Sequence, residues 1–92
     1  MPYVYLLRCG DGSLYAGAAM DLTRRLAEHR AGKASRYTRS RLPVELAWWR
    51  QVEGWGDALR EEILLKRLSR AGKEELLRTT RAAGGTGVGP PV

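Results

Sequence analysis

The sequence predicts an α+β domain in which a small three-stranded antiparallel sheet is flanked by helices, in the order ββαβαα. Residues 3–8 are rich in β-forming side chains, and a glycine-rich turn and a second short run at residues 14–17 follow them, as in a β-hairpin. Further along, residues 21–31 have apolar side chains at helical spacing, and residues 57–68 are apolar nearly all round. Local strand pairing at the front, with helices behind it, is typical of this fold class.

The folded part of the chain is expected to be residues 1–81, as one domain with one small core. Residues 82–92 read Ala-Ala-Gly-Gly-Thr-Gly-Val-Gly-Pro-Pro-Val and lack a periodic apolar face. We therefore expect these residues to form a disordered tail.

The two predicted strands of the hairpin carry three tyrosines. Successive side chains of a strand point to opposite faces, so Tyr3 and Tyr5 share one face of the sheet. Tyr15 lies on the second strand and could come close to Tyr5 across the antiparallel pair, in a register that the sequence leaves open.

The first predicted helix separates two neighbouring arginines. Asp21 is its expected N-cap, and a glycine after residue 31 ends it. At about 100° per residue, its apolar stripe includes His29, with Arg25 beside it. Arg24 falls on the opposite face. The helix therefore turns Arg25 toward the protein and Arg24 toward solvent.

The second half of the chain supplies one strand and two helices. Residues 33–42 form a basic connector, and residues 44–52 form the third strand. The helix at residues 57–68 has apolar side chains on several sides, so we expect it to be packed on two sides. A last helix is expected at residues 73–81.

Charge favours a polyanionic partner. The formal net charge is +6, and 13 of the 16 basic residues are arginine, which binds phosphate oxygens bidentately. A GC-rich genome would also encode arginine in place of lysine. Composition alone therefore does not distinguish a nucleic-acid-binding protein from any other small basic protein.

Cysteine usage and hydropathy indicate a soluble cytoplasmic protein. Cys9 is the only cysteine, which excludes an internal disulfide and suits a reducing compartment. One cysteine and one histidine cannot supply the four ligands of a structural zinc site. The N-terminus is too short and polar for a signal peptide, and no apolar run approaches membrane length.

Five short motifs lie in one order along residues 2–70. The first two are Tyr3-Val4-Tyr5 and Tyr15-Ala16-Gly17, and the others are the segments 21–29, 33–46 and 58–66. In this order and spacing they resemble the GIY-YIG nuclease superfamily, and in particular its small single-domain branch, whose front half is similar to that of structure-specific endonucleases. The first motif has tyrosine where the family pattern has glycine, and the second has alanine in place of isoleucine.

The resemblance implies hydrolysis of phosphodiester bonds in DNA, including branched or damaged DNA as in DNA repair, with one bound Mg²⁺ or Mn²⁺ ion. Glu62 would hold the metal, and its choice over Glu61 rests on the family spacing. Mg²⁺ suits a site with a single carboxylate, because it keeps most of its waters.

The resemblance also assigns roles to the remaining polar residues of the motifs. Arg25 would pair with the scissile phosphate and offset the charge that develops in the transition state. Tyr15 or Tyr5 would orient or deprotonate the attacking water, which requires nearby positive charge because a free tyrosine titrates near pH 10. His29 would contribute to that charge. The expected catalytic set is Tyr5, Tyr15, Arg25, His29 and Glu62.

Further residues are candidates for binding the nucleic-acid backbone. They are the basic side chains of the connector, a lysine on the later helix and the glycine of the second motif: Gly17, Lys33, Arg36, Arg39, Arg41 and Lys66. Contacts of basic side chains with phosphates would be sensitive to salt and independent of sequence. The tryptophans Trp48, Trp49 and Trp55 could stack on unpaired bases, but we expect at least two of them to fill the core.

Each candidate residue also has a structural interpretation. Buried tyrosines and a histidine beside a leucine stripe are common in cores, and Arg25 could form an ion pair. Glu62 and Lys66 are an ordinary i,i+4 pair, worth about 0.2–0.5 kcal/mol. Two alternatives to an enzyme follow: a nucleic-acid-binding module without turnover, or an adaptor whose basic face docks an acidic protein. DNA is expected over RNA, and because the sequence contains no separate recognition domain, sequence specificity is expected to be weak or to be supplied by a protein partner.

Overall fold

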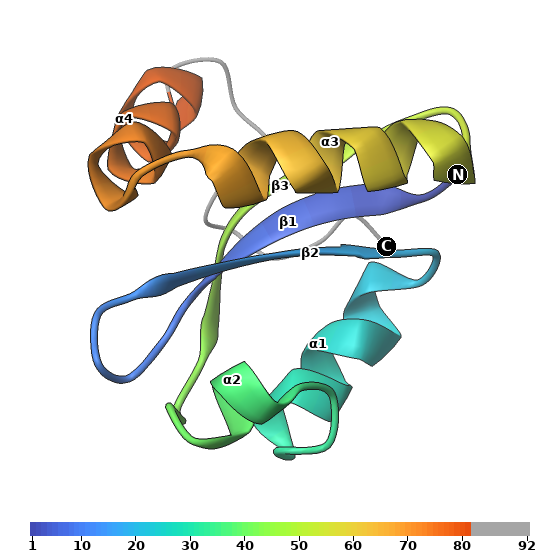
Figure 1. Cartoon of the computed structure of the whole chain (residues 1–92). Helices are drawn as coiled ribbons and strands as arrows, with labels where there is room; N and C mark the ends of the chain where they lie inside the picture. The colour runs from blue at the N-terminus through green and yellow to red at the C-terminus, as the bar shows by residue number, and fades with distance from the viewer. Residues whose placement is uncertain (82–92) are drawn as a thin grey trace.

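The sheet has three antiparallel strands in the order β2-β1-β3 (Figure 1). The computed structural model describes residues 1–81, and the predicted tail at residues 82–92 lies outside the described residues. The strands are β1 (Tyr3–Arg8), β2 (Leu14–Ala19) and β3 (Glu45–Gln51). The predicted α+β class and the antiparallel sheet are confirmed.

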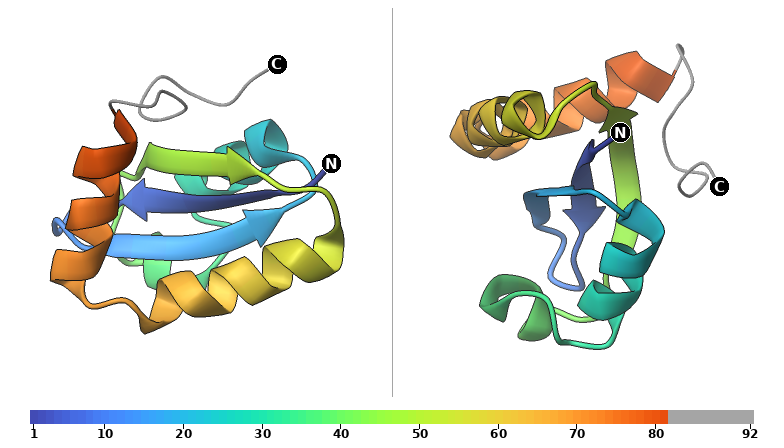
Figure 2. Two further views of the ribbon diagram at one scale, coloured as in Figure 1. Left: turned by 90° about the horizontal axis from the view of Figure 1, so that it is seen from above. Right: turned by 90° about the vertical axis from the view of Figure 1, so that its right-hand side faces the viewer.

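Helices cover both faces of this sheet. Helices α3 (Trp55–Arg67) and α4 (Arg70–Arg81) lie on one face, and α3 runs alongside β2 (Figure 2). Helices α1 (Leu22–Arg30) and α2 (Arg36–Arg39) lie toward the other face. Within residues 1–81, no helix is long and apolar enough to span a membrane.

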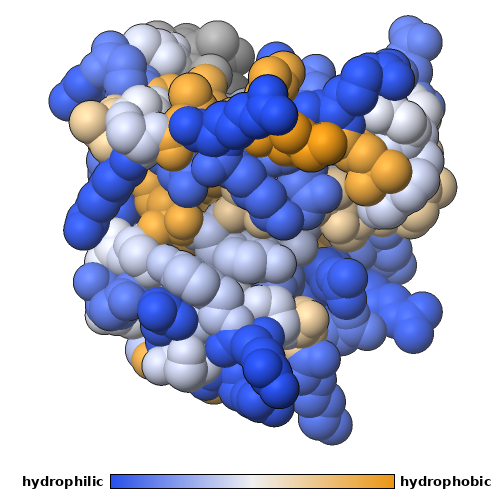
Figure 3. All heavy atoms as spheres, viewed as in Figure 1, coloured by the Kyte–Doolittle hydropathy of each residue, from blue (hydrophilic) through white to orange (hydrophobic). Residues whose placement is uncertain are grey.

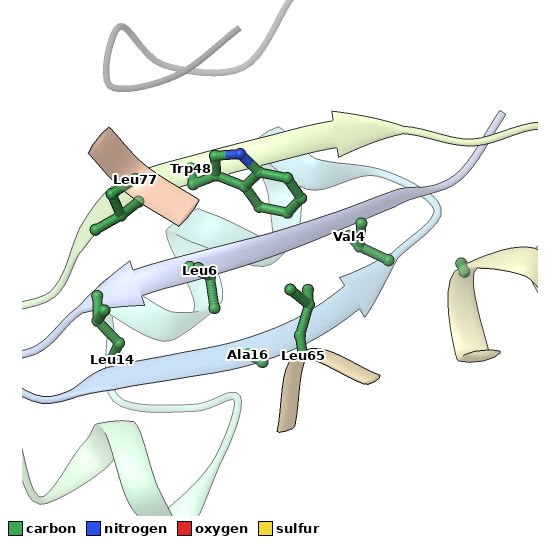
Figure 4. Packing of buried hydrophobic residues seen from close by; sticks show 8 residues of the cluster. Val4, Leu6, Leu14, Ala16, Trp48, Leu65 and Leu77 are labelled. Atoms are coloured by element: carbon green, nitrogen blue, oxygen red, sulfur yellow. The ribbon is translucent and has the colours of Figure 1, made fainter. Parts of the chain in front are cut away.

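The central strand β1 supplies both layers of the core. Val4 and Leu6 point toward α3 and α4, where they meet Leu65 and Leu77 (Figure 4). Tyr5 and Leu7 point to the opposite face and pack with side chains of α1. Because strand side chains alternate, a continuous apolar run in β1 fills two clusters at once.

The chain contains one helix more than the sequence predicted, in the order ββααβαα. The extra helix, α2, is a single turn inside the predicted basic connector. The side chain of Ser35 caps it by accepting a hydrogen bond from the backbone N–H of Thr38. One turn is too short to show an apolar period, so the cap was its only sequence signal.

The predicted packing of α3 on two sides is wrong. Ala58 and Leu65 are buried, but Leu59, Ile63 and Leu64 are 41%, 50% and 60% exposed. The sheet presents one face to α3, and no described element covers the helix from outside. Several of its apolar side chains therefore remain at the surface.

Two of the three tryptophans fill the core, as predicted. Trp48 is 2% exposed and lies in the cluster under α3 and α4. Trp49 packs against the cluster on the opposite face, with its ring edge-on to Tyr3 at 6.1 Å between centroids. Trp55, at the start of α3, is 43% exposed.

Candidate active site

Tyr5 lies at the centre of the candidate site because its strand partner is a glycine. In the register of the hairpin Tyr5 faces Gly17, and Leu7 faces Tyr15, so both tyrosines lie on the face that carries α1. A Cβ atom at Gly17 would lie 2.5 Å from Cζ and the hydroxyl oxygen of Tyr5. The Tyr5 ring thus lies directly over the buried backbone of Gly17. The structure gives this glycine a packing role, beside the nucleic-acid contact predicted for it.

Gly17→Ala is expected to lower the free energy of unfolding by roughly 1–3 kcal/mol, because the added methyl group must displace a buried aromatic ring. Urea unfolding would measure this loss. The matched control is Gly56→Ala in α3, where a Cβ atom would meet only a side-chain nitrogen of Arg60 at 3.6 Å. That variant should be unchanged or more stable by up to about 1 kcal/mol. Equal stability of the two variants would show that the close approach of Tyr5 is not required.

His29 is held between Tyr5 and the short helix α2. Its Nε2 atom lies 2.9 Å from the Tyr5 hydroxyl, and its Nδ1 atom lies 2.9 Å from Oγ1 of Thr38. The Thr38 hydroxyl donates to the backbone carbonyl of Ser35 at 3.4 Å, so it accepts from His29 Nδ1–H. This assignment leaves Nε2 to accept the proton of the Tyr5 hydroxyl. Sequence reasoning missed Thr38, whose one signal was its place three residues after a capping serine.

Burial keeps His29 neutral. The side chain is 1% exposed, and burial together with the charge of Arg25 lowers the pKa of His29 from its ordinary 6.5 to about 4. A neutral imidazole can accept a hydrogen bond from Tyr5, whereas an imidazolium cannot. The positive charge that the sequence analysis assigned to His29 is therefore absent at neutral pH.

Lowering the pH from 6.5 to 4 should destabilise the fold, because the unfolded chain takes up a proton at His29 before the folded chain does. This contribution is complete above pH 6.5 and amounts to about 3 kcal/mol, since each pKa unit corresponds to about 1.36 kcal/mol. Urea unfolding at pH 7.5 to 4.5 would measure it. His29 is the only histidine, so a His29→Gln variant should have a flat profile over most of this range. A similar slope in both proteins would contradict the assignment.

Tyr15 is held by an aromatic stack. Its ring centroid lies 5.4 Å from that of His29 in an edge-on arrangement and 5.6 Å from that of Tyr37 in a stacked arrangement. The guanidinium of Arg41 lies 3.9 Å from the centroid of Tyr37, and its Nε atom is 3.0 Å from a carboxylate oxygen of Asp11. Arg41, predicted to contact phosphate, thus supports the aromatic stack. Tyr37, inside the connector, is a member of the site to which the sequence analysis gave no role.

The two neighbouring arginines of α1 differ as predicted. The Arg24 side chain is 79% exposed and that of Arg25 is 44% exposed. Glu28 lies 3.1 Å from Arg25 and 3.6 Å from Arg24. An ion pair this exposed is worth about 0–1 kcal/mol, so a phosphate can replace Glu28 as the partner of Arg25 at little expense.

Tyr5 shares one electrostatic environment with three other predicted residues. Burial, and then the proximity of Tyr15, raises the pKa of Tyr5 well above its ordinary value. The charge and a hydrogen bond of Arg25 act in the opposite direction, and the carboxylate of Glu62 raises the pKa further. Tyr5 is therefore a neutral phenol at physiological pH, surrounded by the other members of the predicted catalytic set.

Glu62 and Glu61 occupy different sides of α3. Glu62 is close enough to affect Tyr5, its side chain is 20% exposed, and it lies 3.3 Å from Nζ of Lys66. Glu61 instead pairs with Arg50 of β3. The structure therefore separates two neighbouring carboxylates that the helical periodicity could not distinguish.

Glu62 offers one carboxylate to a divalent ion on the side of α3 that affects Tyr5. No cluster of three or more carboxylate, histidine or cysteine ligands occurs among the described residues. One carboxylate, Glu62, suits Mg²⁺, which keeps several of its waters and prefers oxygen ligands. A site of two metal ions would need several converging carboxylates.

Tyr15, the more exposed of Tyr5 and Tyr15, lies at one edge of the sheet. Strand β2 is an edge strand, and a pale band lies between the charged side chains of the two helical layers (Figure 3). Lys33, Arg36 and Arg39 are exposed on the side of α1 and α2, where they line a hollow of about 180 Å³. Lys66 lies on the α3 side. The predicted backbone-binding residues thus lie in both helical layers.

Comparison with known proteins identifies the family. Residues 1–75 match the model of the GIY-YIG catalytic domain. The chain belongs to the GIY-YIG family. It is 48% identical to a UPF0213 protein of Streptococcus pneumoniae over 75 residues, which are 82% of this chain and 76% of that protein. It is 45% identical to a UPF0213 protein of Halobacterium salinarum over 76 residues, 83% of this chain and 99% of that protein.

Solved structures agree with this assignment. The solution NMR structure of a UPF0213 protein from Bacillus halodurans matches with a TM-score of 0.56 and 41% identity, over 86% of this chain and 85% of that chain. A solution NMR structure of a protein from E. faecalis matches with a TM-score of 0.59 and 36% identity, over 87% of this chain and 85% of that chain. The predicted resemblance is confirmed. A GIY-YIG catalytic domain indicates a nuclease, and nucleases of this family generally use a divalent metal ion.

Proposed function

We propose that this GIY-YIG protein is an endonuclease that hydrolyses phosphodiester bonds in DNA, including branched or damaged DNA, with one Mg²⁺ or Mn²⁺ ion held by Glu62. The observation that carries the proposal is the packing of Tyr15, on the edge strand β2, and of Tyr5 against His29, with Arg25 and Glu62 close enough to affect Tyr5. A phosphate at this edge would meet a guanidinium, a phenol and a carboxylate, which are the groups that phosphodiester hydrolysis needs.

Each side chain has a separate task in the reaction. Arg25 exchanges Glu28 for the scissile phosphate and stabilises the charge that develops on it. Tyr15, more exposed than Tyr5, orients or deprotonates the attacking water. Tyr5 remains protonated, and its hydrogen bond to His29 fixes the phenol beside the reacting phosphate. A bound ion at Glu62 would supply a Lewis acid for the phosphate oxygens and the leaving group.

Exposed basic side chains bind the flanking phosphates. Lys33, Arg36 and Arg39 have no ion-pair partner within the described part of the chain, so they are available to the nucleic-acid backbone. Lys66 approaches from α3. Binding through such contacts weakens as salt rises, whatever the sequence.

The proposed setting is DNA repair in the cytoplasm. Cys9 is a free, buried thiol, which agrees with a reducing cytoplasm. Sequence preference would be weak or would be supplied by a protein partner. Repair of branched or damaged DNA would use a nuclease that recognises structure in preference to sequence.

The test is a cleavage assay with labelled duplex, branched and single-stranded DNA and with RNA, in Mg²⁺, Mn²⁺ or a chelator. Tyr15→Phe should abolish cleavage. Loss of cleavage in this variant would show that the activity does not come from a contaminating nuclease. Tyr3→Phe is the matched control, because Tyr3 packs against Trp49 on the same sheet and should be dispensable. Binding without metal-dependent cleavage would overturn the proposal in favour of a nucleic-acid-binding module. Binding of an acidic protein alone would favour the adaptor.

A further inference from the structure

A second groove adjoins the candidate active site through Arg25. Its volume is about 280 Å³, and it lies between the end of β2, the first turns of α1 and the start of α3. Arg25 lines this groove and also interacts with Tyr5. A group bound in the groove would therefore lie next to the phosphate proposed to contact Arg25.

The groove is lined by an aromatic and an apolar side chain that are exposed and do not take part in core packing. Trp55 is 43% exposed, and Met20, which also lines the groove, is 60% exposed. Trp48 and Trp49 pack in the two clusters of the core, whereas Trp55 belongs to neither cluster. An exposed indole beside a polarizable thioether is a suitable surface for stacking a flat ring.

The charges of the groove favour a neutral ligand over a phosphate. Its rim has two carboxylates, Asp21 and Glu28, and two guanidiniums, Arg24 and Arg25, so its formal charge is balanced. Glu28 pairs with both arginines. Once the scissile phosphate has taken Arg25, the rest of the rim holds two carboxylates and one guanidinium, which disfavours a second phosphate. A nucleobase has no charge, and its edge carries the donors and acceptors that such a rim can satisfy.

The size of the groove suits a ligand of about one base. Pockets for drug-sized ligands have volumes of about 300–1,000 Å³, and this groove, at about 280 Å³, lies just below that range. A base pair inside a duplex cannot reach such a groove, because its faces are covered by its neighbours in the stack. The ligand must be a base that is already unpaired or splayed out.

We propose that this groove binds one unpaired base of the substrate, stacked on Trp55, beside the phosphate that is cut. The inference rests on the proposed nuclease function and specifies its substrate class as DNA with a single-stranded arm, flap or bubble next to the scissile bond. Fully paired DNA makes only the contacts to its backbone phosphates, leaves the groove empty, and is therefore the poorer substrate.

The test compares two DNA molecules in a catalytically blocked Glu62→Ala background, so that binding is measured without cleavage. One is a blunt duplex, and the other has the same duplex with a splayed single-stranded arm. Trp55→Ala should weaken binding of the splayed molecule about tenfold, as expected for the loss of one stacked base, and leave binding of the duplex unchanged. Trp55→Phe should retain most of the affinity, because it keeps an aromatic face.

Leu64→Ala on α3 is the matched control, because Leu64 is 60% exposed and does not line the groove. It should bind both DNA molecules like the parent. Circular dichroism and thermal unfolding would show that each variant is folded. As a direct readout, 2-aminopurine placed in the unpaired arm next to the junction should change its fluorescence on binding to the parent, and this change should be absent in Trp55→Ala.

Equal weakening on both DNA molecules, or no weakening on either, would overturn the proposal. The outcome is independent of the nuclease assay. If the wild-type protein does not cleave but Trp55 still determines preference for the splayed arm, the proposed function fails and the base-binding groove remains. If the wild-type protein cleaves and the Trp55→Ala variant cleaves both molecules at the same rates as wild type, the groove proposal fails and the nuclease remains.

Discussion

Arg25→Ala is expected to lower the rate of DNA cleavage by about 10³-fold or more, the range found when an arginine that stabilises transferring phosphoryl groups is removed. Among residues 1–81, Arg25 has only the partly exposed carboxylate of Glu28 as an ion-pair partner, and it also interacts with Tyr5, so its guanidinium is available to the phosphate. Single-turnover cleavage at saturating enzyme would measure the effect on the chemical step, separately from affinity. Folding should be little affected, since an exposed ion pair adds about 0–1 kcal/mol.

Arg24→Ala is the matched control for this prediction. Arg24 is the adjacent residue, has the same charge and pairs with the same Glu28, but its side chain is 79% exposed. Its removal should change the single-turnover rate by less than a few fold and reduce affinity slightly through one lost positive charge. Equal losses in the two variants would mean that Arg25 acts through net charge alone. A fully active Arg25→Ala variant would remove Arg25 from the site.

The hairpin and helix α1 could be predicted from the sequence because each has its own local signal. The hairpin follows from β-forming side chains around a glycine-rich turn. Helix α1 follows from its cap at Asp21, whose side chain accepts from the backbone N–H of Arg24. The exposure of α3 was not readable, because periodicity shows which side chains are apolar and not how many neighbours a small domain can place around them. The single turn of α2 was also hidden, since it lies in a segment without an apolar period.

The sequence could predict which residues belong to the candidate site, but not how they contact one another. The motifs named the tyrosines, Arg25, His29 and Glu62 by type and order. They could not show that Gly17 lies under the Tyr5 ring or that Thr38 holds His29, because both contacts join segments whose spacing depends on the fold. The state of His29 was equally hidden. Its pKa depends on burial, and burial reversed the expectation of a positive charge.

Glu62→Gln should lower the rate of cleavage by about 10²–10³-fold, because the substitution keeps the shape of the side chain and removes the charge proposed to hold the metal ion. Glu62 is the one carboxylate that we propose as a metal ligand, and no cluster of three or more candidate ligands is present among the described residues. The Mg²⁺ concentration that gives half of the maximal cleavage rate should be higher than for the wild-type protein. Stability should be nearly unchanged, since the pair of Glu62 with Lys66 is an i,i+4 surface pair.

Glu61→Gln is the control that the chain itself offers. It removes the same charge from the same helix at the adjacent position, but Glu61 pairs with Arg50 on β3 and not with the groups around Tyr5. Glu61→Gln should cleave at the wild-type rate with an unchanged dependence on Mg²⁺. If Glu61→Gln is the inactive variant, the metal lies on the other side of α3, and the electrostatic link between Glu62 and Tyr5 has no part in catalysis. If both variants cleave normally, a divalent ion is held without a carboxylate of α3, and the proposed role of this helix fails.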